Sequence, residues 1–313
     1  MKYGFVGFYD EKTAKFAADA GFDGLEIFVG PVMDVAMGLD LDAISEDNLK
    51  QIMNYLGELR IGITTITSGA LHLHCDSIKR ADANRHFKKA LQSAKKFGTD
   101  VVTTNAFTDH KTTLSNNMRG YKEVFSEYAK IAEAEGVQIA IENCPHWSGS
   151  PPVIGNLACS PEMWEAMFEA VPSKAIGLQF DPSHLVWQGI DYLRGIKEFS
   201  DRIYSFHAKD TEILPEEQYR YGVFGQQINA PGDWPGGWWR YRIPGFGQVD
   251  WKQVYNALYE IEYAGAMVIE HEDPVFGGDR SESGLGLGPR TEMGLRLGLA
   301  YLKSTDYFNH SYK

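Results

Sequence analysis

The sequence predicts an α/β fold, a single (β/α)8 TIM barrel domain over residues 1–313. Eight short apolar runs alternate with eight helical patterns, and four of these runs end on a carboxylate or an imidazole. Buried parallel strands read as such continuous apolar runs. A chain of 313 residues could form two domains, but α/β barrels commonly exceed about 200 residues as one domain.

The expected strands are short and rich in β-branched residues, at residues 2–8, 23–29, 62–68, 100–106, 137–143, 176–181, 203–208 and 266–271. The expected helices fill the gaps, at residues 11–20, 42–60, 77–97, 114–135, 160–171, 189–200, 250–262 and 288–303. Gly21, Gly98 and Gly136 follow three of the helices, and Gly accepts the left-handed conformation that ends a helix. A doubly wound open sheet is the alternative, but this sequence lacks the Gly-x-Gly-x-x-Gly turn that would follow the first strand of such a sheet.

Residues 211–249 interrupt the alternation of strands and helices. They contain Pro, Gly and many aromatic residues, among them Trp238, Trp239 and Tyr241. We therefore expect a long aromatic-rich insertion after the seventh strand. Loops at this end of a barrel carry the active site, so the insertion could cover a ligand. It could equally pack on itself or on a second subunit.

Composition excludes several classes of protein. A net charge of −12 argues against a protein that binds the phosphates of nucleic acid, or an anionic membrane surface. Cys75, Cys144 and Cys159 are odd in number and lack Cys-x-x-Cys spacing, so we expect reduced thiols. The first residues do not resemble a signal peptide, and no apolar run is long enough to span a membrane. These features predict a cytoplasmic protein.

Four successive expected strands end on residues that bind metals: Glu142, Asp181, His207 and Glu270. A single acid or histidine at a strand end is more often a cap or a salt-bridge partner. Four at the same end of the fifth to eighth strands predict one shared metal site. Three carboxylates and one imidazole favour a hard or borderline divalent ion, Mn²⁺ first, with Mg²⁺ and Co²⁺ as alternatives. Zinc stays open.

Five short motifs surround these residues: Ile141-Glu142-Asn143, Asp181-Pro182-Ser183-His184, His207-Ala208-Lys209-Asp210, Pro244-Gly245-Phe246-Gly247-Gln248-Val249-Asp250-Trp251 and Ile269-Glu270-His271. In order and spacing they resemble the xylose isomerase-like sugar isomerase/epimerase family, which includes ketose 3-epimerases and enzymes of inositol catabolism. The resemblance spans nearly the whole chain. Its motifs are specific for the superfamily and much less so for one reaction.

The resemblance implies that Glu142, Asp181, His207 and Glu270 bind one divalent metal and that His184 touches a substrate oxygen. Glu142 and Glu270 would also form an acid/base pair. A proton on carbon next to a carbonyl is weakly acidic, and a metal that binds the carbonyl and hydroxyl oxygens stabilises the enediolate that forms. A carboxylate on each face can then take and return protons. The predicted function is a metal-dependent sugar isomerase or epimerase.

Other residues are candidates for substrate contacts. By the resemblance, Arg242, or alternatively Arg240, matches an arginine that contacts substrate in shorter epimerases, although an exposed loop arginine fits equally well. His146 and Trp147 follow Glu142 closely and could line the pocket or pack on the barrel rim.

Earlier strands add three more candidates. Glu26 and Asn105 end the second and fourth strands and could bind sugar hydroxyls or cap the following helices. His72 alternates with His74 along an extended segment, so both imidazoles lie on one side and line the pocket or a surface turn. Lys209 and Asp210 could steady the imidazole of His207 or a carboxylate ligand, or form a plain salt bridge.

Three alternative functions remain open. Some relatives act as lyases or hydratases on 3-keto sugars or 3-keto glycosides, by the same proton abstraction followed by β-elimination. An endonuclease IV-like hydrolase with three zinc ions is disfavoured by the acidic charge. A non-catalytic sugar-binding barrel would retain the fold alone. The expected substrate is a small sugar or keto sugar, unphosphorylated because no Gly-rich phosphate loop is present. The resemblance implies a homo-oligomer, either a dimer or a tetramer.

Overall fold

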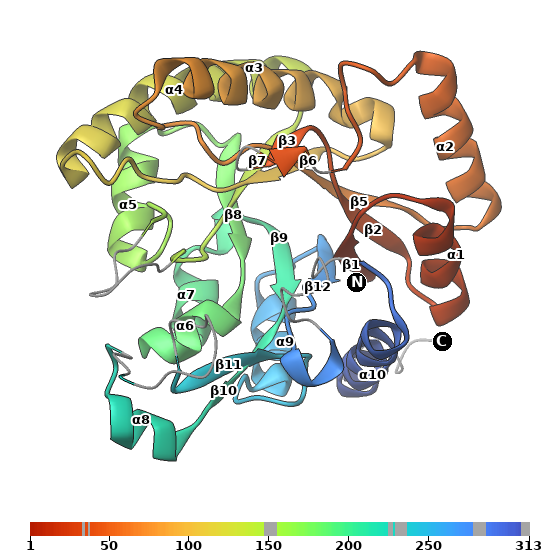
Figure 1. The fold of residues 1–313 in the computed structure, drawn as a ribbon, viewed down its shortest axis with the longest axis vertical. Coiled ribbons are helices and arrows are strands. Elements are labelled where there is room, and N and C mark those ends of the chain that lie inside the picture. The colour runs from red at the N-terminus through yellow and green to blue at the C-terminus, as the bar shows by residue number, and fades with distance from the viewer. Residues whose placement is uncertain are drawn as a thin grey trace.

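In a computed structural model the chain forms a closed barrel of eight parallel strands surrounded by helices (Figure 1). The structure describes residues 1–32, 35–36, 38–146, 155–224, 228, 237–277 and 286–307. The barrel strands are β1 (Lys2–Gly7), β2 (Gly24–Phe28), β5 (Gly62–Thr67), β6 (Val101–Thr104), β7 (Gln138–Glu142), β8 (Ile176–Phe180), β9 (Ile203–Ala208) and β12 (Ala266–Ile269). Each strand pairs in parallel with the next one in this order, and β12 pairs with β1. The predicted (β/α)8 barrel is confirmed.

The helices pack around the barrel: α1 (Glu11–Ala20), α2 (Glu46–Glu58), α3 (Ser77–Ser93), α4 (Leu114–Glu135), α5 (Pro161–Ala170), α6 (Pro182–Gln188), α7 (Tyr192–Glu198), α9 (Trp251–Glu260) and α10 (Pro289–Thr305). Short 3-10 turns η1 (Ala94–Phe97), η2 (Ser200–Arg202) and η3 (Pro274–Phe276) extend or join them. Side chains of Asp10, Ser45 and Thr113 cap α1, α2 and α4. None of the helices in these described ranges is both long and apolar enough to cross a membrane.

The region after β8 differs from the expected single helix at residues 189–200. Two helices, α6 and α7, lie there, and α6 begins directly after the strand. Asp181 caps α6 by accepting a hydrogen bond from Ser183 N at 2.8 Å, and Pro182 occupies its first turn. Gly189, at φ 70°, ends it. His184 therefore lies in the first turn of a helix that starts at the barrel mouth.

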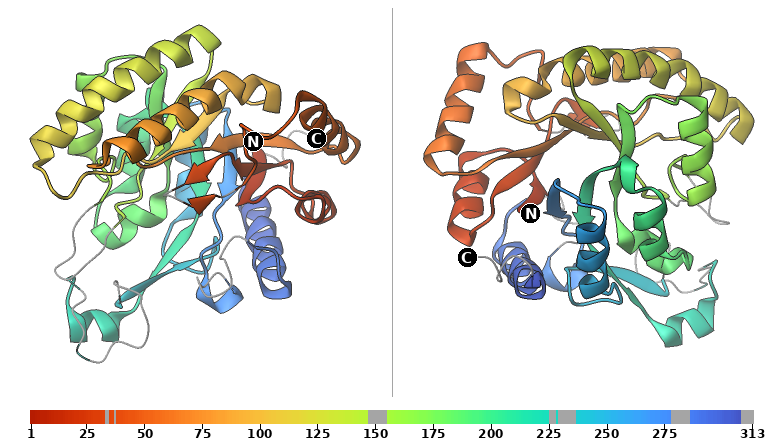
Figure 2. Two further views of the ribbon diagram at one scale, coloured as in Figure 1. Left: turned by 45° about the horizontal axis from the view of Figure 1, so that its top comes forward. Right: turned by 180° about the vertical axis from the view of Figure 1, so that it is seen from behind.

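The insertion after the seventh barrel strand contains secondary structure of its own. β10 (Asp210–Ile213) and β11 (Trp239–Arg242) pair as an antiparallel hairpin, and α8 (Pro215–Tyr221) lies between them at the periphery (Figures 1 and 2). A second small hairpin, β3 (Pro31–Val32) and β4 (Val35–Ala36), follows β2. Trp238, Trp239 and Tyr241 join Trp187 of α6 in a small buried cluster. Residues 225–227 and 229–236 of the insertion lie outside the described residues.

Asp210 holds the segment that follows β11 against β10. Its fully buried carboxylate accepts hydrogen bonds of 2.8 to 3.0 Å from the backbone N–H groups of Thr211, Gly245 and Val249 and from the indole of Trp251. Four donors leave this carboxylate committed to the loop, so it does not steady the His207 imidazole. The Pro-Gly-x-Gly motif is thus a docking segment.

Gly247 is expected to tolerate no side chain. A Cβ there would lie 2.3 Å from Asp210 Oδ1 and 2.5 Å from the carbonyl oxygen of Thr211, so the docked loop would have to shift. We expect Gly247→Ala to lower the free energy of unfolding by about 1–3 kcal/mol, measured by urea denaturation. Gly57→Ala in α2 is the control, because nothing lies within 4 Å of its Cβ position, and it should stabilise by about 0.5–1 kcal/mol. Equal stability of the two variants would contradict the docking role.

The two ends of the described chain meet on the barrel. Tyr3 of β1 donates a hydrogen bond of 2.7 Å to Asp306 Oδ2, and Tyr259 of α9 donates one of 2.7 Å to Asp306 Oδ1. Asp306 follows α10 and is fully buried. A single carboxylate therefore joins the first strand to the last two helices.

Candidate metal centre and active site

The four predicted metal ligands come together at the carboxyl ends of the barrel strands. Glu142 is the last residue of β7, Asp181 follows β8, His207 lies in β9 and Glu270 follows β12. The Nδ1 atom of His207 lies 3.4 Å from Glu142 Oε1 and 3.3 Å from Glu270 Oε2. Parallel strands deliver their last side chains to one face of a barrel, so residues 128 positions apart in the chain meet.

His184 enters the same cluster. Its Nε2 atom lies 3.5 Å from Glu142 Oε1 and 3.3 Å from Asp181 Oδ2. One potential ligand atom from each of Glu142, Asp181, His184 and Glu270 lies within 4.8 Å of the others. Two histidines, His184 and His207, therefore face the place where a cation would sit.

Buried atoms without hydrogen-bond partners surround the place where a cation and a substrate oxygen would bind. Asp181 Oδ2, His184 Nε2 and His207 Nδ1 are buried and have no hydrogen-bond partner among the described residues. Asp181 Oδ2 lies at ion-pair distance from Lys209, at 3.2 Å, and from His184 Nε2, at 3.3 Å. Buried polar atoms are almost always hydrogen-bonded, so three exceptions around one point need an explanation. A carboxylate-rich set with one imidazole is the donor set of a hard or borderline divalent ion.

Glu26 supports His207 from inside the barrel. Its carboxylate is 1% exposed, lies 3.3 Å from His207 Nε2 and accepts hydrogen bonds from Thr65 and Gln179. Burial alone would raise the pKa of Glu26, but His207 lowers it. Likewise, burial opposes protonation of His207, yet Glu26 and Glu270 raise its pKa well above the usual value. Nε2 thus donates its proton to Glu26 and Nδ1 faces the cluster. Glu26 is therefore a partner of His207, and its contact with sugar hydroxyls stays a prediction.

Lys209 is a buried cation beside the cluster. Its ammonium forms ion pairs with Glu270, with Glu272 at 2.9 Å and with Asp181 at 3.2 Å, and its side chain is 1% exposed. Burial alone would lower the pKa of Lys209, but the carboxylates of Glu270 and Glu272 raise it well above its ordinary value. Lys209 and Glu272 each lie two residues after an expected ligand. The alternation of side chains along a strand could have placed both in the site.

Two further candidates lie beside Glu142. Asn105 Nδ2 donates a hydrogen bond of 3.1 Å to Glu142 Oε2. His146 has a left-handed backbone at φ 47°, and its ring packs against Phe107 with centroids 4.1 Å apart. Burial lowers the pKa of His146 to about 4, so its ring is neutral at pH 7. Trp147 lies outside the described residues.

Among the described residues, neither Arg242 nor Arg240 forms a hydrogen bond or ion pair with the predicted metal ligands, although one of them was expected to contact substrate. Arg242 donates to Asp273 at 2.8 Å and pairs with Glu212, and Arg240 pairs with Glu212 at 2.7 Å. The residue of β11 that enters the site is Tyr241, whose Oη lies 2.6 Å from His184 Nδ1. Arg240 and Arg242 lie on one face of the strand and Tyr241 on the other.

His72 also lies away from the cluster. Its ring is fully buried among Phe87, Phe125 and Tyr128, and Nε2 lies 2.8 Å from Thr104 Oγ1. Burial lowers the pKa of His72 to about 3. The expected extended segment is a turn, in which His74 N donates a hydrogen bond of 3.2 Å to the carbonyl oxygen of Leu71, and the ring of His72 faces α3 and α4.

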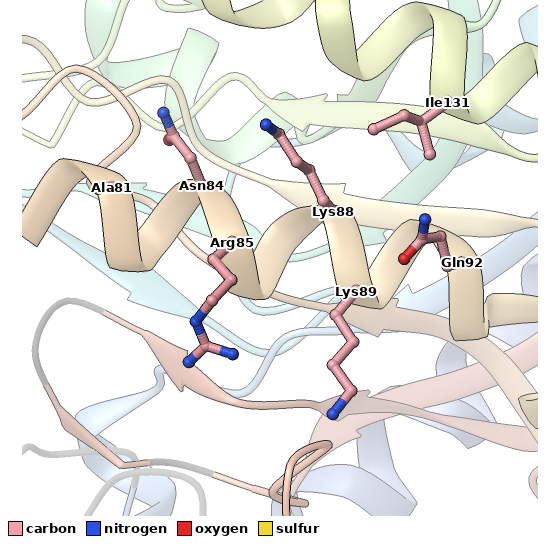
Figure 3. A pocket seen from close by; sticks show the side chains of 7 residues that line it. All are labelled: Ala81, Asn84, Arg85, Lys88, Lys89, Gln92 and Ile131. Atoms are coloured by element: carbon pink, nitrogen blue, oxygen red, sulfur yellow. The ribbon is translucent and has the colours of Figure 1, made fainter.

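One hollow among the described residues lies away from the barrel mouth. It has a volume of about 630 Å³ and lies on the outer face of α3, with Arg85, Lys88 and Lys89 among its lining residues (Figure 3). Asp42 pairs with Arg85 at 2.8 Å and with Lys89 at 2.5 Å, and Glu127 pairs with Lys88 at 2.6 Å. Its cations are therefore already neutralised, and none of the unpaired cluster atoms lies there.

Comparison with known proteins identifies the family. Residues 14–304 match the model of the xylose isomerase-like TIM barrel family. The chain belongs to this family. This xylose isomerase-like barrel is 30% identical over 188 residues to the uncharacterized protein YfiH of Bacillus subtilis, covering 58% of this chain and 51% of that protein. It is 25% identical over 173 residues to an inosose dehydratase of Lactiplantibacillus plantarum, covering 55% and 53%. The chain thus spans about half the length of the curated relatives it matches.

Solved structures share the fold across nearly the whole barrel. A D-psicose 3-epimerase crystallised in the presence of D-fructose superposes with a TM-score of 0.69 at 16% identity, covering 98% of this chain and 99% of that one. The probable 3-DHS dehydratase AsbF of Bacillus anthracis gives 0.67 at 14% identity, covering 97% and 99%. The IOLI protein with a bound zinc atom gives 0.67 at 20% identity, covering 97% and 96%.

Proposed function

We propose that this xylose isomerase-like barrel is a divalent-metal-dependent isomerase or epimerase of a small sugar or keto sugar. One observation carries the proposal: ligand atoms of Glu142 and Glu270 lie within 4.8 Å of each other, beside buried ring nitrogens that lack partners. Two carboxylates that flank one reacting carbon can take a proton from one face and return it to the other. The psicose 3-epimerase neighbour acts on a substrate of the proposed class.

The proposed ligands are Glu142, Asp181, His207 and Glu270. Glu26 supports His207 in this role, because a carboxylate that accepts the far N–H fixes the ring and leaves the other nitrogen for a metal. The donor set favours Mn²⁺, and the zinc in the IOLI neighbour keeps that ion open. When bound, the ion would polarise the carbonyl and hydroxyl oxygens of the substrate.

Both proposed acid/base groups are held as anions. Burial alone would raise the pKa of Glu270, but Lys209 outweighs it and lowers the pKa to about 2. Burial likewise opposes ionisation of Glu142, while His184 and His207 lower its pKa well below the usual value. Asn105 fixes Glu142 Oε2 and leaves Oε1 toward the centre. Carboxylates in this state can accept a proton at neutral pH.

A dehydratase is the second candidate, because relatives of this chain carry the name inosose dehydratase. Elimination begins with the same proton abstraction and then needs a donor for the departing hydroxyl. Lys209 and His184 both lie within 3.3 Å of Asp181 Oδ2 and supply N–H groups on that side. For either reaction the substrate is proposed to be uncharged, since Lys209, Arg240 and Arg242 are each paired with carboxylates.

NMR in D₂O tests the proposal directly. Protein loaded with Mn²⁺ is incubated with ketoses, inososes and 3-keto glycosides. It is then removed from the products by filtration. Deuterium at the carbon next to the carbonyl, together with a new stereoisomer or an aldose–ketose pair, supports an isomerase or epimerase. Deuterium with an unsaturated product supports the dehydratase. No exchange with any sugar, by protein with full metal content, would count against both.

Metal affinity is expected to fall as the pH falls. Burial opposes protonation of His207, but Glu26 and Glu270 raise its pKa well above the usual value, so the metal-free ring is protonated at and below neutral pH. Metal binding must then release that proton, and affinity should weaken by up to about tenfold per pH unit. Calorimetry at several pH values in buffers of different ionisation enthalpy measures the proton release. An affinity independent of pH between 5 and 8 would contradict His207 as a ligand.

A further inference from the structure

Tyr241 is the side chain through which the insertion reaches the site. It lies on β11, is 6% exposed, and places its Oη 2.6 Å from His184 Nδ1. The ammonium of Lys209 lies over the same ring, 4.4 Å from its centroid. One phenol therefore contacts an imidazole and a cation of the cluster, although no sequence motif connects it to either.

Two aromatic pairs fix β11 against α6. Trp239 stacks on Trp187 with centroids 4.7 Å apart and planes 5° apart, and Tyr241 meets His184 edge-on at 5.2 Å. Trp239 and Tyr241 share one face of a strand, whereas His184 and Trp187 share one face of a helix. Thr211 Oγ1 of β10 adds a hydrogen bond of 2.8 Å to the carbonyl oxygen of Ser183. Packing therefore sets the position of the phenol.

The hydrogen bond between Tyr241 and His184 has a preferred direction. At the other side of the imidazole, Nε2 faces Glu142 Oε1 at 3.5 Å and Asp181 Oδ2 at 3.3 Å. An N–H group at Nε2 is attracted by these carboxylate oxygens, whereas a lone pair there is repelled by them. A neutral imidazole carries one proton, so Nδ1 must then accept. The hydroxyl of Tyr241 is placed to donate to it.

We propose that Tyr241 is a positioning residue that holds His184 as its Nε2–H tautomer. His184 then offers a hydrogen-bond donor to a substrate oxygen and does not offer a ring nitrogen to the metal. The inference rests on the proposed function of the site. It separates the two histidines by their partners: Glu26 accepts a hydrogen bond from His207 Nε2, whereas Tyr241 donates one to His184 Nδ1, so that the proton of the His184 ring stays on the inward Nε2.

Tyr241→Phe tests the positioning role. The variant keeps the ring, and with it the contacts to Lys209 and Trp239, but removes the hydroxyl. We expect kcat to fall about 10–100-fold while KM and metal affinity stay close to those of the unaltered protein. Tyr204→Phe is the matched control, because Tyr204 Oη bonds the carbonyl oxygen of Lys174 at 2.5 Å, at the opposite end of β9. This control should leave kcat unchanged.

The tautomer of His184 can be determined by a measurement that does not depend on turnover. Long-range ¹H–¹⁵N NMR of the metal-free and zinc-loaded protein reports which imidazole nitrogen carries the proton, and His184→Gln assigns the signal. We expect Nε2–H in the unaltered protein and a mixture of tautomers in Tyr241→Phe. A proton on Nδ1 in the unaltered protein overturns the proposal, even if the variant fails to fold. An unchanged tautomer or an unchanged kcat in a folded variant also overturns it. Absence of sugar turnover in the unaltered protein would instead overturn the proposed function and leave the tautomer result standing.

Discussion

Replacing Glu270 with glutamine is expected to abolish proton exchange between substrate and solvent. The amide keeps the shape of the side chain but cannot accept a proton, so the rate should fall by about 10²–10⁴-fold. Glu142→Gln should have an effect of similar size, because we propose that each carboxylate serves one face of the reacting carbon. Deuterium incorporation is measured by NMR in D₂O at saturating Mn²⁺, and the metal content of each variant is measured in parallel.

Glu260→Gln is the matched control for both variants. Glu260 is 61% exposed and pairs with Lys197 at 2.8 Å on the protein surface, so exchange should be unaffected. Near-normal exchange by metal-loaded Glu270→Gln would contradict its role as an acid/base group. Loss of exchange together with loss of metal would show that Glu270 acts as a ligand, and would leave Glu142→Gln to test the proton transfer.

Replacing Lys209 with methionine is expected to destabilise the metal-free protein strongly. Asp181 and Glu270 would lose a buried counter-ion, and an uncompensated buried charge costs about 3–5 kcal/mol. Lys209 holds the pKa of Glu270 low against the effect of burial. Without it the carboxylate should protonate at higher pH. Urea denaturation at pH 7 with and without Mn²⁺ measures the effect, and the loss should be smaller when a divalent ion neutralises the same carboxylates.

Lys197→Met provides the comparison for Lys209. Its side chain is 57% exposed, and a surface pair of this kind contributes less than about 1 kcal/mol. If Lys209→Met is no more destabilising than Lys197→Met, or loses equal stability with and without metal, the ammonium does not balance the charge of the cluster. A result of that kind would also weaken the argument that the site suits an uncharged substrate.

The barrel was predictable because its signals are local. Apolar runs bounded by helix-ending residues such as Gly21 and Gly136 set the order of the elements, and a closed parallel barrel then brings the strand ends together. Glu142 and Glu270 could therefore be paired without knowledge of a single contact. Helix α6 was missed although Asp181 and Pro182 form a cap and a first turn, because Asp181 was assigned to the end of a strand and the next helix was expected only at residues 189–200.

Contacts between distant segments could not be predicted in this way. Tyr241 and His184 are 57 residues apart and meet only through the pairing of β10 with β11 and the docking of that hairpin on α6. Alternation along a strand predicts that Arg242 and Tyr241 face opposite ways, but not which one faces the site. Alternation with His74 suggested that His72 lines the pocket, but the segment forms a turn, and the His72 ring packs against Phe87 of α3 and Phe125 of α4.

The hydrogen bonds of Asp306 with Tyr3 and Tyr259 bear on how the chain could be rewired. Because the first strand and the residue after the last helix already share a buried carboxylate, a short peptide could link the two ends of the described barrel without disturbing its strand order. New termini could then be opened in an exposed turn on the side away from Glu142 and Glu270. A circularly permuted chain of this kind could begin at a different barrel strand and still form the same closed barrel.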